Sequence, residues 1–187
     1  MFSKKFTVLY LLLIALILAG CSENPSIVNE NERQIPSSIE SPCGEAYFNL
    51  YIEQTTLAGS VRVANDLDNL YITYYLDSPY LAEPEGMNFW LGINAPTKRG
   101  TPKQYPFHSD NTGYVDNYSF TIALSDIQNY LNGKSFYFMT HVSVVVQLDG
   151  GKYSKSTDGF SELIVKSKSK GAWYGYNSFT LYDCGAQ

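Results

Sequence analysis

Apolar and polar residues alternate along the chain between residues 46 and 76. In the first such stretch every second side chain is apolar, at Ala46, Phe48, Leu50 and Ile52. The same period of two continues over residues 60–64 and 70–76. Since successive side chains of a strand point to opposite faces, this pattern predicts antiparallel strands with one side buried. Residues 65–69, Asn-Asp-Leu-Asp-Asn, predict a hairpin loop between the second and third strands.

Further stretches predict strands at residues 88–93, 119–124, 136–148, 152–156 and 178–183. Asp149-Gly150-Gly151 predicts a tight turn, because both glycines tolerate a positive φ. Residues 125–133 predict a short helix, with Ser125 as its cap, Gly133 at its end and Ile127 and Leu131 on one face. Residues 161–168 fit either a second short helix or another strand.

Together these elements predict an all-β fold, an antiparallel two-sheet sandwich that is immunoglobulin-like or jelly-roll, with one or two short helices. Residues 43–187 are enough for one β-sandwich domain that buries a proper core. No second linker or internal repeat divides this part of the sequence.

The first residues have a different pattern. Lys4 and Lys5 precede an apolar run over residues 8–18, which predicts a secretory signal. The run is shorter than the roughly 20 apolar residues that a membrane-spanning helix needs. It ends in Leu18-Ala19-Gly20-Cys21, which resembles the lipobox of bacterial lipoproteins. The alternatives are an ordinary secretory signal that contains a cysteine, or an uncleaved N-terminal anchor.

The lipoprotein resemblance implies an address and an attachment. A lipoprotein signal peptide over residues 1–20 is cut off, Cys21 is lipidated, and the protein partners with the membrane through that lipid anchor. Ser22 follows the cysteine where an aspartate would favour the inner membrane, so the resemblance implies the outer membrane, with the periplasmic or cell-surface face left open. Residues 21–42 are polar and rich in proline and glutamate, which predicts a disordered tether. An edge strand around residues 35–39 is the alternative.

The two remaining cysteines, Cys43 and Cys184, stand at the two ends of the predicted domain. In an exported, oxidising setting we expect them to form a disulfide. Free thiols or a metal site are the alternatives, although no CxxC motif or Cys/His cluster accompanies them.

The negative charge argues against two kinds of partner. The formal charge of the chain is −5, and loss of Lys4 and Lys5 with the signal lowers it to −7. An acidic protein is a poor ligand for nucleic acid, whose phosphates need a basic surface. For the same reason, anionic lipid head groups would not attract it directly.

Six short segments of the domain resemble uncharacterised secreted β-sandwich domains of Bacteroidota. They are Gly59-Ser-Val-Arg-Val, Leu70-Tyr-Ile-Thr-Tyr, Asn88-Phe-Trp-Leu-Gly, Tyr118-Ser-Phe-Thr-Ile, Phe138-Met-Thr-His-Val and Gly171-Ala-Trp-Tyr-Gly. The resemblance implies the fold and the bacterial group. It implies no activity and no catalytic residue.

Catalytic and metal-binding signatures are sparse. The sequence has no HExxH, G-x-S-x-G or P-loop motif, so we assign no catalytic residue and no cofactor. His141 lies on a predicted strand and is expected to be a hydrogen-bonded structural histidine. His108, Ser109 and Asp110 are adjacent in sequence, whereas catalytic triads come from separated segments. Asp66, Asp68 and Asn69 offer oxygen ligands, but turn formation is favoured over calcium binding, so no metal is assigned.

Aromatic residues are the most promising functional feature. Tyr47, Tyr51, Tyr71 and Tyr75 fall on the outward face of predicted neighbouring strands, where rings can stack on sugars or anchor a protein interface. Loops add Tyr80, Trp90, Tyr105, Phe107, Tyr114, Trp173, Tyr174 and Tyr176. The alternative is that the aromatics fill the core or cover the sheet, and Trp90 and Trp173 in particular are expected in the core.

These features predict a non-enzymatic envelope lipoprotein that binds a glycan or a protein through an aromatic surface. Two alternatives remain: an accessory subunit of an envelope complex that binds no small ligand, and a hydrolase.

Replacing Cys21 with alanine should abolish incorporation of labelled palmitate into the protein, because the resemblance makes this thiol the lipid attachment point. Metabolic labelling and immunoprecipitation measure the effect, with Cys43→Ala as the matched control that keeps its label. Undiminished labelling of Cys21→Ala would show that the lipobox interpretation is wrong.

Overall fold

A computed structural model of the chain describes residues 42–162, 164–166 and 173–185. The predicted signal peptide, Cys21 and the tether up to residue 41 lie outside the described residues. What is described consists mainly of antiparallel strands, which confirms the predicted all-β class. Among the described residues, no helix combines the length and apolar character needed to cross a membrane.

The first four strands are β1 Gly44–Ile52, β2 Thr56–Asn65, β3 Asn69–Leu76 and β4 Tyr80–Gly92. The middle of the chain adds β5 Phe107–His108, β6 Asn117–Ala123 and β7 Ser135–Val146. The last strands are β8 Thr157–Ser161, β9 Ile164–Lys166, β10 Trp173–Gly175 and β11 Asn177–Thr180. The 3₁₀ helices of the described chain are η1 Pro102–Gln104, η2 Leu124–Tyr130 and η3 Asp149–Gly151.

Several predicted boundaries need correction. The strand predicted at residues 152–156 is wrong, because these residues form the return from η3 and β8 begins only at Thr157. The helix predicted at 125–133 is the shorter η2, and the Ser125 hydroxyl bonds Asp126 instead of capping the helix. Residues 164–166 form strand β9, so the strand alternative applies to that part of the 161–168 segment.

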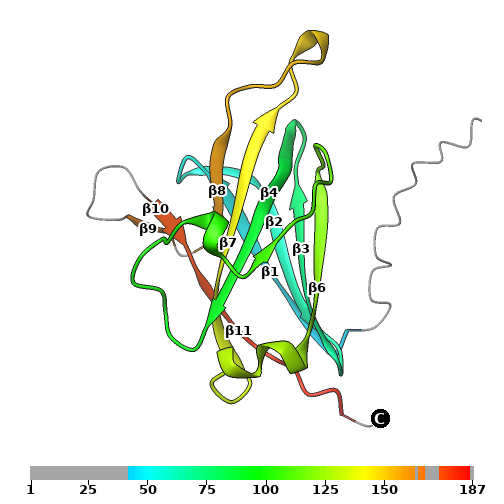
Figure 1. The fold of residues 1–187 in the computed structure, drawn as a ribbon, viewed down its shortest axis with the longest axis vertical. Helices are drawn as coiled ribbons and strands as arrows, with labels where there is room; N and C mark the ends of the chain where they lie inside the picture. Colours follow the sequence, from blue (N-terminus) through cyan, green and yellow to red (C-terminus); the bar gives the residue numbers. More distant parts are fainter. Residues whose placement is uncertain (1–41, 163, 167–172, 186–187) are drawn as a thin grey trace, which may run out of the picture. The chain divides into compact units, whose positions relative to one another are not determined.

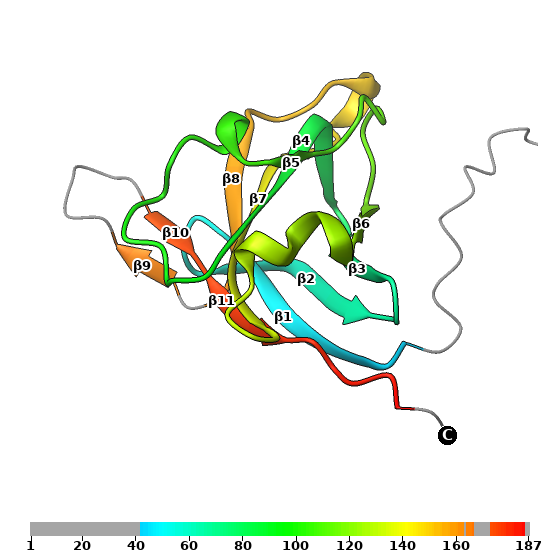
Figure 2. The same cartoon turned by 60° about the horizontal axis from the view of Figure 1, so that its bottom comes forward.

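One continuous sheet forms both layers of the fold. Its strand order is β5-β4-β7-β8-β1-β2-β3-β6, with β11 pairing beside β7. Strand β8 pairs with β7 on one side and with β1 on the other, and there the sheet turns from one layer to the next. At the opposite edge, a bridge between Ala82 and Val115 joins β4 to the residues before β6. The result is a nearly closed, barrel-like sandwich (Figure 1 and Figure 2).

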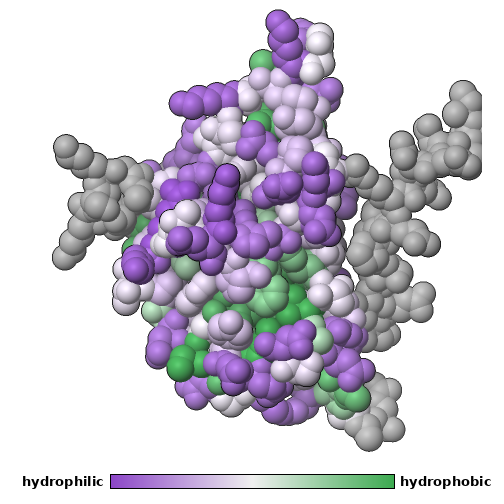
Figure 3. All heavy atoms as spheres, in the orientation of Figure 1, coloured by the Kyte–Doolittle hydropathy of each residue, from purple (hydrophilic) through white to green (hydrophobic). Residues whose placement is uncertain are grey.

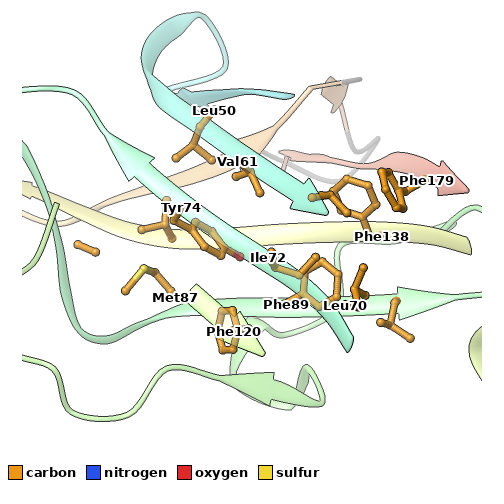
Figure 4. Close-up of a cluster of buried hydrophobic side chains, with 14 of the residues drawn as sticks. Leu50, Val61, Leu70, Ile72, Tyr74, Met87, Phe89, Phe120, Phe138 and Phe179 are labelled. Carbon is orange, nitrogen blue, oxygen red and sulfur yellow. The ribbon is translucent and has the colours of Figure 1, made fainter. Parts of the chain in front are cut away.

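The main core lies between the two layers. The apolar positions predicted for β1, β2 and β3 point inward, among them Leu50, Val61 and Ile72 (Figure 4). Phe89 and Phe138 meet them from β4 and β7. Tyr74 of β3 is fully buried, and its hydroxyl donates to the Asn88 carbonyl of β4 at 2.8 Å. This hydrogen bond ties the two layers together while satisfying a buried polar group.

Cys43 and Cys184 form a disulfide, as predicted, although 141 positions separate them in sequence. Their Cα atoms are 5.0 Å apart. The neighbouring Asn65 holds the C-terminal segment, because its side chain accepts from the Tyr182 N–H at 2.9 Å and donates to the Tyr182 carbonyl at 3.1 Å. The segment from Tyr182 to Cys184 is therefore fastened beside the start of β1.

Replacing Cys43 and Cys184 together with serine should lower the free energy of unfolding by about 2–5 kcal/mol, because the bridge restricts a long loop of the unfolded chain. Urea denaturation measures the change. The wild-type protein in reducing agent should match the double variant, and the double variant should not respond to reducing agent. An unchanged unfolding midpoint in the double variant would contradict a stabilising role for the bridge.

Candidate functional site

The four predicted tyrosines lie on one outer face, formed by β1, β2, β3 and β6. The strand register sets Tyr47 opposite Arg62, and Tyr71 and Tyr75 opposite Ala64 and Ser60. Strand β2 separates β1 from β3, so the tyrosines form two rows about 10 Å apart instead of lying on neighbouring strands.

Structural contacts occupy part of this face. Arg62 is only 8% exposed, and its Nε donates to Glu45 at 2.5 Å. The Tyr71 hydroxyl donates to Asp66 at 2.6 Å, and burial together with this carboxylate raises the pKa of Tyr71. By contrast, Tyr47 and Tyr75 are 58% and 39% exposed and offer contact surface. Tyr51 is half-buried.

Asp66 organises the hairpin between β2 and β3. Its Oδ1 accepts from the backbone N–H groups of Asp68 and Asn69 at 2.8 and 2.7 Å. Burial raises the pKa of Asp66, but the bonds from Tyr71 and from these N–H groups outweigh it and lower the pKa. The predicted turn is confirmed. Within the described part of the chain, no group of three or more His, Cys, Asp or Glu residues is arranged to hold a metal ion.

The outer face of the other layer carries a second apolar cluster. Its buried members are Tyr105, Met139, Phe160, Trp173 and Tyr174. The 93–106 connection and the β9–β10 pair lie over this side of β4, β7 and β8 (Figure 1 and Figure 2). The Tyr174 hydroxyl of β10 holds the connection by donating to the Pro96 carbonyl at 3.3 Å. Within the connection, the Tyr105 hydroxyl donates to the Arg99 carbonyl at 2.7 Å.

A chain of polar side chains runs through this layer. Arg99 of the connection pairs with Asp158 of β8 at 2.5 Å, and its guanidinium lies 4.9 Å from the centre of the Phe160 ring. The other oxygen of Asp158 lies 2.9 Å from His141 Nε2 on β7. His141 Nδ1 lies 3.2 Å from the Asn88 amide nitrogen, and the Asn88 oxygen lies 2.6 Å from His108 Nδ1.

The protonation states follow from burial and partners. His141 is 4% exposed, and burial lowers its pKa although Asp158 acts in the opposite direction. The neutral ring donates through Nε2–H to Asp158 and accepts from Asn88 at Nδ1. Hydrogen bonding from His141, with a further contribution from Arg99, lowers the pKa of Asp158 to about 2. Because both ring nitrogens have partners, His141 positions Asp158, as expected of a structural histidine.

A cavity of about 610 Å³ opens between the end of β4, the 93–106 connection and η2. We call it the Trp90 cavity. Its aromatic lining is Trp90, Tyr105 and Tyr130, and its amide lining is Asn94, Gln104 and Asn129. The Trp90 ring lies against Gly92, where an added Cβ would be 2.8 Å from two ring carbons. On the face of the molecule that Figure 3 shows, hydrophobic residues gather in the lower half, around the lower end of β4 and η2.

A second cavity, of about 550 Å³, has a different character. We call it the acidic cavity, because Glu83, Glu85 and Asp110 line it together with His108 and Lys103. A bulge between Ala82 and Met87 shapes it, with Glu85 at a φ of 57°. The Ser156 hydroxyl donates to Glu83 at 2.8 Å. The 93–106 connection contributes residues to both cavities, and Tyr47, Tyr51, Tyr71 and Tyr75 line neither.

The Trp90 cavity was not predicted from the sequence. Trp90 was expected in the core and is instead half-buried at the cavity wall, whereas Trp173 is buried in the second cluster as expected. One available signal was the length of the 93–106 connection, since long loops in compact domains are often functional.

Comparisons of the chain with protein-family models, with curated proteins and with solved structures found no match.

The free energy of unfolding should fall as the pH drops below about 6.5. Burial lowers the pKa of His141 in the folded state, so the unfolded chain binds the proton more readily. Asp158 adds a second loss at lower pH, between about 3.8 and 2, because its folded pKa is also lowered. Urea denaturation across this pH range measures both losses.

His141→Gln should flatten the decline that begins near pH 6.5, and Asp158→Asn should remove part of the loss at the acidic end. His108→Gln is the control for the loss of a histidine as such, because it removes the bond to Asn88 but leaves the His141–Asp158 contact in place. An equally steep decline in His141→Gln would show that other groups cause it.

Proposed function

We propose that this protein is a non-enzymatic, outer-membrane-anchored envelope lipoprotein whose β-domain binds a saccharide in the Trp90 cavity. The observation that carries the proposal is the lining of that cavity, in which aromatic rings stand beside side-chain amides. Sugars present apolar C–H faces and polar hydroxyl edges, and the two kinds of lining residue match these two surfaces.

The size and shape of the cavity suit a small ligand. Its volume of about 610 Å³ falls within the range of roughly 300–1,000 Å³ that is usual for small-molecule sites. Trp90 is half-buried and Tyr130 is 36% exposed, so both rings keep surface for stacking. Asn94, Gln104 and Asn129 each offer a donor and an acceptor to ligand hydroxyls.

The cavity wall is held in place without a ligand. The bond from Tyr174 to the Pro96 carbonyl and the Arg99–Asp158 pair fasten the connection to the domain, and the bond from Tyr105 to the Arg99 carbonyl braces it internally. A site that is already ordered loses less conformational entropy when it binds. This favours recognition by a formed pocket over folding of a loop around the ligand.

The proposed anchor rests on Leu18-Ala19-Gly20-Cys21 and the polar residues that follow it. Two or more acyl chains would give stable attachment, since a single chain gives only marginal membrane binding. A lipid-tethered domain with an open saccharide pocket would then capture glycans at the cell envelope.

A second candidate is protein docking through the tyrosine face of β1, β2 and β3. The exposure of Tyr47 and Tyr75 near the buried Arg62, which pairs with the exposed Glu45, favours it. Tyrosine and arginine are enriched in protein interfaces. In that case the protein would be an accessory subunit of an envelope complex.

Trp90→Ala in the full-length protein should weaken binding to its preferred glycan by about tenfold or more, because truncation removes the main stacking ring. Tyr130→Ala should weaken it by roughly fivefold through loss of the second ring. A panel of envelope and plant-cell-wall oligosaccharides, followed by calorimetry on the best binder, measures both effects. Thermal unfolding of each variant separates lost binding from lost fold.

Tyr47→Ala is the matched control, because it removes an exposed ring on the opposite layer and should leave affinity unchanged. If Tyr47→Ala and Tyr75→Ala weaken binding while Trp90→Ala and Tyr130→Ala do not, the tyrosine face is the site. If no saccharide in the panel binds, the proposed function is wrong.

A further inference from the structure

We propose that the saccharide bound in the Trp90 cavity is anionic, a sugar that carries a carboxylate or a sulfate group. The inference rests on the proposed function and adds the chemical class of its ligand. It is argued from the charged residues of the cavity wall, because the aromatic and amide residues that carry the proposed function are neutral.

The charged side chains that line the Trp90 cavity, among the described residues, are Lys98 and Arg99, and both are cationic. The chain as a whole has a formal charge of −5. The charge at the cavity wall is therefore opposite in sign to the net charge of the protein. Such a local excess attracts anionic ligands and repels cationic ones.

The two cavities that share the 93–106 connection differ in sign. Glu83, Glu85 and Asp110 line the acidic cavity, where Lys103 is the neighbouring cation. An anionic group would be repelled there and attracted to the Trp90 cavity. The connection thus contributes to two cavities of opposite charge, and the cavity that suits an anion is the one with the stacking rings.

Arg99 is rigidly placed and keeps hydrogen-bonding capacity. One terminal nitrogen of Arg99 pairs with Asp158, and the guanidinium lies over the Phe160 ring. Its Nε is buried and has no acceptor among the described residues. A guanidinium carries five N–H donors in a fixed plane. The buried Nε is out of reach of a ligand, so only the terminal nitrogens of Arg99 could donate to an oxygen-rich group.

Lys98 supplies the charge that is not compensated. Asp158 balances Arg99, whereas Lys98 takes part in no ion pair within the described part of the chain. The Lys98 residue is exposed at the cavity wall, next to Arg99 in sequence. An anionic group on a stacked sugar would therefore find the exposed ammonium of Lys98 beside the guanidinium of Arg99.

The test compares pairs of oligosaccharides that share one sugar skeleton and differ in whether they carry the anionic group, using the full-length protein and calorimetry. One pair is trigalacturonate and its fully methyl-esterified form, and the second is a sulfated oligosaccharide and its desulfated form. The acidic member should bind about tenfold more tightly, as expected for a charge-assisted hydrogen bond. The advantage should shrink as sodium chloride is raised, because salt screens an exposed lysine.

Lys98→Gln should remove most of this advantage, so that the acidic and neutral members of each pair bind with nearly the same affinity. Lys103→Gln is the matched control, since it removes the same charge from the same connection but at the acidic cavity. Selectivity in the first pair identifies a carboxylate ligand and selectivity in the second a sulfate ligand, and either supports the inference.

If neutral and acidic members bind equally, and Trp90→Ala weakens both, the anionic ligand is excluded and the proposed saccharide function stands. If neither member of either pair binds and the wider panel is also negative, both proposals fail. If Lys103→Gln abolishes the selectivity as fully as Lys98→Gln, the cavity assignment is wrong.

Discussion

The fold depends on one constraint: a single antiparallel sheet must cover its own apolar face. Strand β8 makes this possible, because it pairs with β7 in one layer and with β1 in the other. The two halves then close on each other, with Phe48 and Phe138 packed edge to face at 5.1 Å. The Tyr74 hydrogen bond to the Asn88 carbonyl joins the halves deeper in the core.

The same curvature creates the candidate site. The outer face of the β4, β7 and β8 layer also carries large apolar side chains, including Met139 and Phe160, and these need a cover. The 93–106 connection and the β9–β10 pair supply it, and Asp158 holds the connection through Arg99. The Trp90 cavity lies where this cover ends, beside the last residues of β4.

Sequence reasoning worked where one face of a strand meets solvent. The alternation in β1, β2 and β3 placed their inward residues and the outward tyrosines correctly. It was less successful where both faces are covered or the strand is irregular. The first half of β4 contains Pro84 and a bulge, so its early start at Tyr80 was missed. The strand expected at 152–156 was wrong, because the turn at Gly150 and Gly151 extends into an irregular return.

The linear sequence by itself determined the strand class, the outward side of Tyr47 and Tyr75, and the pairing of Cys43 with Cys184. These properties follow from local alternation and from a small count of cysteines. Only the tertiary structure decided that one sheet forms both layers and that Arg99, His141 and Asp158 meet. Those three residues come from a loop and two strands, and local alternation does not encode the strand order that brings them together.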